Sequence, residues 1–117
     1  MATRNVTLTP FENGRGSIAI WTGLLNGDDG TPIDWTRFAD RCIQFTGTFG
    51  TGGSIQMEGS NDGTNWGILN DLQGSQIVKT ATGIEGIAEV PRYVRPKVTA
   101  GDGTTSLTAT LVLRCTP

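Results

Sequence analysis

Apolar and polar residues alternate with a period of two along most of this 117-residue chain. Two segments show it most clearly, 42–49 and 106–113. Successive side chains of a strand point to opposite faces of a sheet, so the pattern predicts strands with one buried and one solvated face. The side chains predicted to point inward from these two strands are Ile43, Phe45, Phe49, Leu107, Ala109, Leu111 and Leu113.

Shorter runs of the same kind predict further strands at 6–11, 17–25, 54–58, 66–69, 76–80 and 92–99. Stretches rich in Gly, Asn and Asp separate them, as expected for turns. Two segments stay open: 35–39 fits a helical turn or an edge segment, and 84–90 fits a strand or a short helix. Eight or so short, regularly spaced strands predict an all-β fold, an antiparallel β-sandwich of jelly-roll-like type.

The most specific local signal is a hairpin turn at Asn61, Asp62 and Gly63, between the strands 54–58 and 66–69. Asn and Asp tolerate turn dihedrals, and Gly supplies a positive φ at no steric cost. The three residues therefore predict a structural turn of type I, closed by a G1 bulge.

The length predicts one domain with a core of its own. We divide the chain into an N-terminal arm or first strand at 1–12 and a single β-sandwich at 13–117. Residues 2–7 have little core character, so we expect either an arm that extends over a neighbouring molecule or a frayed terminus.

Charge and composition narrow the function. The chain has 9 basic and 11 acidic residues, a net charge of −2, and no histidine. This balance lacks the basic field that gathers phosphate, so we expect no nucleic-acid partner. We also expect no membrane partner, since no segment has the apolar length of a membrane span or a signal peptide; synthesis in the cytosol follows.

Catalytic and metal-binding signals are weak. Without histidine the chain lacks Ser-His and Cys-His pairs and the commonest metal ligand. Cys42 and Cys115 are predicted to be buried free thiols. The acidic loop around Asp28 and Asp29 departs from the calcium-loop pattern, because Gly30 stands where an oxygen ligand belongs. We therefore expect no enzyme activity, no catalytic residues, no metal and no cofactor.

Aromatic and cationic residues leave two interpretations each. Trp21, Trp35, Trp66 and Tyr93 fit the core, with a sugar-stacking platform as the alternative. Arg95 and Lys97 point outward from one strand. They fit a solvated face, or a surface that pairs with a partner's carboxylates.

Several segments resemble small structural proteins encoded among the head genes of tailed bacteriophages. This resemblance covers most of the chain from Trp21 onward. It rests on WTGLLNGD at 21–28, FTGTFG at 45–50, EGSNDGTNW at 58–66, RYVRP at 92–96 and TAGDGTTSL at 99–107. The third and fourth segments are also similar to parts of discoidin-like, galactose-binding jelly rolls.

The phage resemblance implies a capsid decoration (cement) protein on the virion surface. Its partners would be the major capsid protein and further copies of itself, as a dimer or trimer. The jelly-roll resemblance implies the alternative, a carbohydrate- or receptor-binding module of the virion or tail. The residues that we predict at the partner interface are Thr3, Arg4, Asn5, Asp28, Asp29, Arg95 and Lys97.

Overall fold

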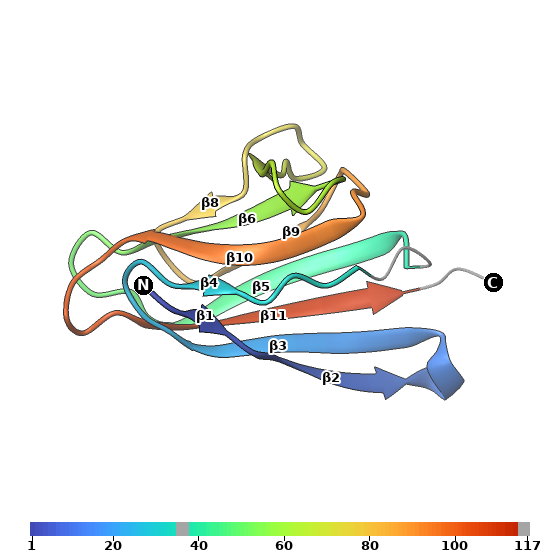
Figure 1. Cartoon of the computed structure of the whole chain (residues 1–117), viewed down its shortest axis with the longest axis horizontal. Helices are drawn as coiled ribbons and strands as arrows, with labels where there is room; N and C mark the ends of the chain where they lie inside the picture. Colours follow the sequence, from blue (N-terminus) through green and yellow to red (C-terminus); the bar gives the residue numbers. More distant parts are fainter. Residues whose placement is uncertain (35–37, 115–117) are drawn as a thin grey trace.

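The computed structural model describes residues 1–34 and 38–114, and it is a sandwich of two β-sheets (Figure 1). The all-β prediction is thereby confirmed, and so is the antiparallel one, since every pair of named strands is antiparallel apart from β1 and β4. The first sheet has the order β1-β4-β10-β6-β7, with β8 also on β6, and the second has the order β2-β3-β11-β5-β9.

The first sheet, called sheet A below, contains β1 (Thr3–Arg4), β4 (Asp29–Gly30), β6 (Ser54–Ser60), β7 (Gly67–Ile68), β8 (Val78–Lys79) and β10 (Tyr93–Ala100). The second, sheet B, contains β2 (Val6–Phe11), β3 (Gly16–Leu24), β5 (Asp40–Thr48), β9 (Gly83–Gly86) and β11 (Ser106–Arg114). A short 3₁₀ turn, η1 (Glu12–Gly14), links β2 to β3.

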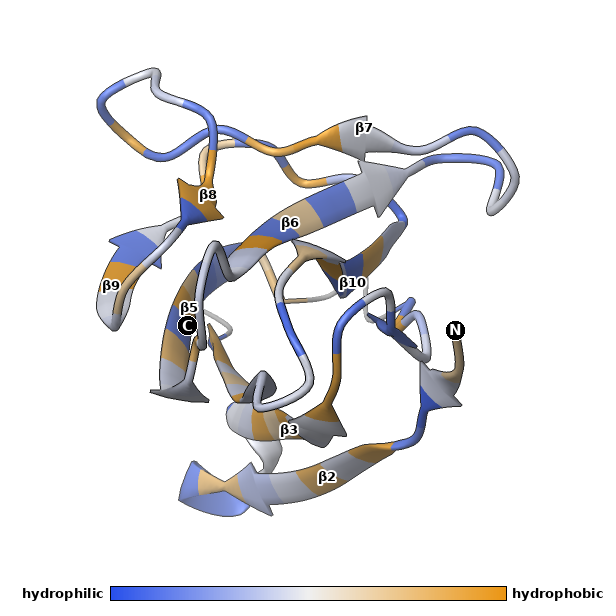
Figure 2. Ribbon diagram, turned by 90° about the vertical axis from the view of Figure 1, so that its left-hand side faces the viewer, coloured by the Kyte–Doolittle hydropathy of each residue, from blue (hydrophilic) through white to orange (hydrophobic). Residues whose placement is uncertain are grey.

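The core lies between the two sheets and follows the predicted alternation. Leu107, Ala109, Leu111 and Leu113 of β11 are all fully buried. Figure 2 shows the alternation as orange and paler bands along the strands of both sheets. Trp21 is also fully buried, and its indole Nε1 donates a hydrogen bond of 2.9 Å to the Thr31 carbonyl. This hydrogen bond offsets the free-energy cost of burying the indole N–H away from water.

Two segments that the sequence left open are now partly settled. Residues 83–86 form strand β9, paired with β5, so the strand interpretation holds there. Trp35 lies outside the described residues, as does Cys115, while Phe38 packs in the core.

None of the described helical segments is long and apolar enough to cross a membrane.

The N-terminal segment, predicted as an arm or a first strand, pairs with both sheets. Thr3–Arg4 pairs in parallel with β4 of sheet A, and Val6–Phe11 pairs with β3 of sheet B. The chain therefore passes from one sheet to the other between Arg4 and Val6, and Val6 packs against the core. Backbone hydrogen bonds with β4 and side-chain hydrogen bonds to Asp28 and Asp29, rather than apolar contacts, hold residues 2–4 in place.

Candidate interaction surfaces

A network of charged side chains ties the N-terminus to sheet A, and it is centred on Asp28 and Asp29. The two carboxylates are only 3% and 4% exposed. Asp28 accepts hydrogen bonds from the Ala2 N–H at 2.9 Å, the Leu25 N–H at 2.9 Å and the Arg4 Nε at 2.8 Å. These donors occupy both carboxylate oxygens, so the acidic loop offers little to a cation.

The surroundings of Asp28 alter its pKa in two opposing ways. Burial alone would raise the pKa, but the hydrogen bonds from Leu25, Arg4 and Ala2 and the charge of Arg4 together lower it below its usual 3.8. A carboxylate with a depressed pKa stabilises the fold at neutral pH. This stability is present above the unfolded-state pKa and is lost as the pH falls through the folded-state pKa.

We therefore expect the free energy of unfolding to decrease as the pH falls below about 4, because the unfolded chain binds protons before the folded chain does. The urea midpoint measured from pH 6 to pH 2.5 checks this. Asp28→Asn is the matched variant, since it removes the titrating group, and its midpoint should depend less steeply on pH. Equal slopes for the two proteins would exclude Asp28 as a source of the acid sensitivity.

Arg95 of β10 forms the second half of the network. Its Nη1 lies 3.3 Å from the Asp29 carboxylate, and its Nε lies 3.0 Å from Glu58, which is 7% exposed. The guanidinium also lies 4.0 Å from the centre of the Trp66 ring, in cation–π geometry. Asp29 in turn accepts a hydrogen bond of 2.7 Å from the Thr3 hydroxyl. One arginine thus connects β4, β6, β10 and the segment before β7.

Five of the seven predicted partner-binding residues meet in this network: Thr3, Arg4, Asp28, Asp29 and Arg95. Asn5 lies between β1 and β2 with its side chain exposed. Lys97 stands opposite Asp29 and Gln56 in the strand register. The sequence reasoning missed Glu58 and Trp66 as partners of Arg95, because only the pairing of β6 with β10 brings Glu58 opposite Arg95.

The loop at Asn61, Asp62 and Gly63 joins β6 to β7, as predicted, but it is longer than a tight turn. The last paired residues are Gly59 and Gly67, so residues 60–66 form the connection. Asp62 organises it by accepting hydrogen bonds from the Ser60 hydroxyl, the Thr64 and Asn65 N–H groups and the Asn65 side chain. These bonds hold the pKa of Asp62 well below its usual value, with the Asn65 N–H as the largest cause. Side-chain hydrogen bonds replace the backbone pairs of the predicted G1 bulge.

Gly63 has φ +77°, which confirms the predicted positive φ. A Cβ there would lie 3.3 Å from Tyr93. Gly63→Val should lower the free energy of unfolding by more than about 1 kcal/mol, since a β-branched residue is strained at positive φ. Gly67→Val is the control, because a Cβ at Gly67 meets no atom within 4 Å. Equal urea midpoints for the two variants would disprove the strain argument.

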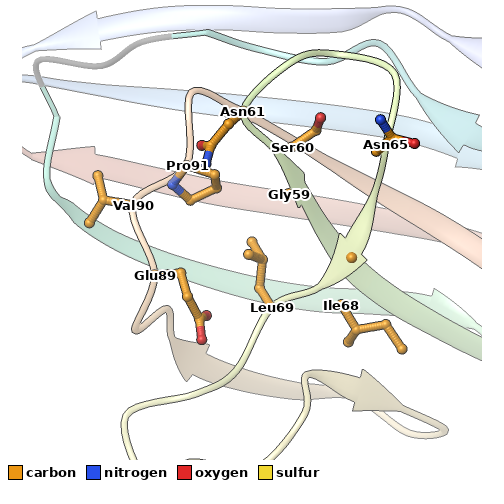
Figure 3. A pocket seen from close by; sticks show the side chains of 10 residues that line it. Gly59, Ser60, Asn61, Asn65, Ile68, Leu69, Glu89, Val90 and Pro91 are labelled. Carbon is orange, nitrogen blue, oxygen red and sulfur yellow. The ribbon is translucent and has the colours of Figure 1, made fainter.

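A shallow cleft of about 450 Å³ lies beside this loop (Figure 3). Leu69 and Ile68 line one wall, and Val90 and Pro91 come from the segment that leads into β10. The Glu89 carboxylate accepts hydrogen bonds of 2.7 Å from both the backbone and the side-chain nitrogen of Asn70, and these lower its pKa. The ten lining residues include no Cys, His, Lys or Arg, and the cleft can hold a group by apolar contact and by hydrogen bonds.

The remaining reactive groups are also engaged or protected. Lys79 and Glu85 form an ion pair between β8 and β9. Burial raises the pKa of the Cys42 thiol, Glu85 adds to the effect and Arg114 opposes it; a raised pKa keeps a thiol protonated and weakly nucleophilic. No group of three or more metal-ligating side chains occurs within residues 1–34 and 38–114.

Trp21 and Trp66, two candidates for a sugar-stacking platform, are both shielded from solvent to different degrees. Trp21 is in the core, and Trp66 is partly buried with Arg95 over its ring. Tyr93 lies beside Arg92, whose guanidinium is 5.1 Å from the ring centre. The described part of the chain thus presents no exposed tryptophan for a sugar-stacking platform.

The outer faces of the two sheets differ in charge. The outer face of sheet A carries Glu58, Arg95 and Lys97. On sheet B, two adjacent rows of outward positions cross all five strands without a single formal charge. We call these ten residues the neutral face. They are Gly86, Cys42, Val112, Ile18 and Thr9 in one row and Ile84, Gln44, Thr110, Ile20 and Thr7 in the other.

Comparison with known proteins supports the fold. No family model matches the chain, and no curated protein sequence does. The solved structure of the SPBc2 prophage-derived protein YomS superposes with a TM-score of 0.63 at 12% identity, over 84% of this chain and 93% of that one. Peruvianin-I, a cysteine peptidase from Thevetia peruviana latex, gives 0.52 at 15% identity, over 94% of this chain and 61% of that one. These likenesses show a shared β-sandwich architecture across almost the whole chain.

Proposed function

We propose that this protein is a non-enzymatic structural protein of a bacteriophage virion that decorates the capsid. It binds the major capsid protein from outside and stabilises the head. The observation that carries the proposal is the likeness to a prophage-derived protein over 84% of the chain, which agrees with the phage head-protein resemblance of the sequence.

The chemistry of the described surface supports this proposal. The buried carboxylates are used in ion pairs and hydrogen bonds that hold strands together, and the Cys42 thiol has a raised pKa. A decoration protein needs a rigid scaffold with contact surfaces, and many copies on one shell multiply modest contacts through avidity. The receptor-binding alternative would need an aromatic platform, whereas Trp21 is buried and Trp66 is covered by Arg95.

The test is deletion of the gene from the phage or prophage genome that encodes it. We expect particles to assemble and adsorb to the host normally, but to release DNA at a lower temperature than wild-type particles. Adding back the purified protein should restore the release temperature. Unchanged heat resistance together with lost adsorption would contradict the decoration role and support the receptor-binding alternative.

A further inference from the structure

The neutral face is unusual for the outer surface of an antiparallel sheet, which is normally solvated and polar. Val112, Ile18 and Ile20 lie next to one another across β11 and β3, with threonines around them. The outer face of sheet A provides the internal comparison, since it carries charges at equivalent outward positions of β6 and β10. On sheet B the next outward row carries the opposed charges Asp40 and Arg114, so the ten residues form a bounded uncharged patch.

An apolar ridge and a hollow lie side by side at one end of this face. Ile84 of β9 is 60% exposed, and Leu72, which lies over Gly86, is 70% exposed. Next to them is a hollow of about 290 Å³, lined by Cys42, Gly86 and Val112 of the neutral face and also by the charged residues Asp40, Arg41 and Arg114. Exposed aliphatic side chains that are bordered by charged residues are typical of protein contact sites.

We propose that the neutral face is the surface on which a second copy of this chain packs, sheet against sheet, around a two-fold axis. In such a contact the same patch is buried on both copies, so any charged side chain within it would be buried twice. Each copy carries a net charge of −2, and a face without formal charge lets two copies meet without burying unpaired or repelling charges.

The size of the face fits this occupant. β3, β5 and β11 have nine residues each. Nine residues span about 30 Å and five strands roughly 20 Å, so the whole outer face of sheet B offers on the order of 600 Å², and the two rows of the neutral face make up roughly 250 Å² at its centre. A standard stable interface buries about 800 Å² on each partner. The outer face of sheet B together with Ile84 and Leu72 thus approaches the area that a stable dimer needs, with the neutral face at its centre.

The test is sedimentation equilibrium of the purified full-length chain, which requires no capsid and so is independent of the proposed function. We expect wild-type protein at twice the 12.4 kDa of one chain. Thr110→Lys places a charge in the middle of the neutral face and should weaken self-association at least about a hundredfold. Thr99→Lys makes the same exchange at an exposed position of β10 in sheet A and should leave the dimer intact.

Gln44→Lys provides a second variant on the neutral face. Because Gln44 is exposed, this substitution should not disturb folding, and a loss of the dimer would reflect the lost contact itself. Circular dichroism should show the same strand content in all variants. The proposal would be overturned if the wild-type protein were a monomer at every protein concentration over about a 100-fold range, or if it were a trimer. So would a dimer that Thr99→Lys dissociates and Thr110→Lys does not. A monomer whose capsid binding is lost in Thr110→Lys would assign the face to the capsid protein instead.

Discussion

Removal of residues 2–8 is expected to lower the free energy of unfolding by more than about 3 kcal/mol, since it takes the partners away from buried charges and removes part of a sheet. Asp28 would lose the Ala2 N–H and Arg4, and Asp29 would lose the Thr3 hydroxyl. Val6 would no longer pack against the core, and β3 would lose half of its pairing with β2. A typical domain has only about 5–15 kcal/mol of stability to lose.

Urea denaturation of the truncated and full-length chains measures this effect. Asn5→Ala is the control, because Asn5 lies in the same segment with an exposed side chain, and it should leave the midpoint unchanged. The structure and the arm expectation differ sharply at this point. An arm that reaches over a neighbour could be removed without any change in the midpoint or slope of the isolated protein, and that result would contradict the role of β1 described above.

Arg95→Met is expected to destabilise the fold by about 3 kcal/mol, because breaking a buried ion pair leaves uncompensated charge in the protein. Methionine preserves much of the side-chain volume but provides no donor for Asp29 or Glu58, which are 4% and 7% exposed. It also loses the cation–π contact with Trp66. The Arg95 side chain is 17% exposed, so solvent screens the network only in part.

Lys97→Met is the matched control, since Lys97 lies on the same face of the same strand and makes no ion pair with another described residue. Its urea midpoint should stay close to wild type. The double variant Arg95→Met/Glu58→Gln should recover part of the lost stability by removing one unpaired charge. If Arg95→Met and Lys97→Met were equally stable, the network would contribute nothing to folding.

The acid-dependent stability and the Arg95 network have a common origin in the packing of the N-terminus. Asp28 and Asp29 are adjacent in sequence but serve different partners, since Asp28 binds Arg4 and Asp29 binds Arg95. Both pairs fasten β4, a strand of only two residues, between β1 and β10. Backbone pairing alone offers few hydrogen bonds to such a short strand, so side chains supply the rest.

The sequence alone determined the fold class, because one-sided burial imposes a period of two on a strand and this period is local information. It gave the inward side chains of β11 correctly, and it gave the positive φ of Gly63, because only the residue's own backbone is involved. It also placed the turn-rich boundaries between strands. Period-two alternation does not say which strands pair, however, so strand order and register stayed undetermined.

Only the tertiary structure decided what the charged residues do. Arg95 meets Glu58 because β10 pairs with β6, and it meets Asp29 because β4 joins the same sheet; these residues are far apart in the chain. The pairing of β1 with β4 likewise brings Thr3 and Arg4 to Asp28 and Asp29. The neutral face likewise depends on strand register, since each of five strands contributes two of its ten residues. The energy of strand pairing comes from contacts between distant segments. Local sequence patterns therefore predict the strands, but they do not predict the surfaces that the paired strands form.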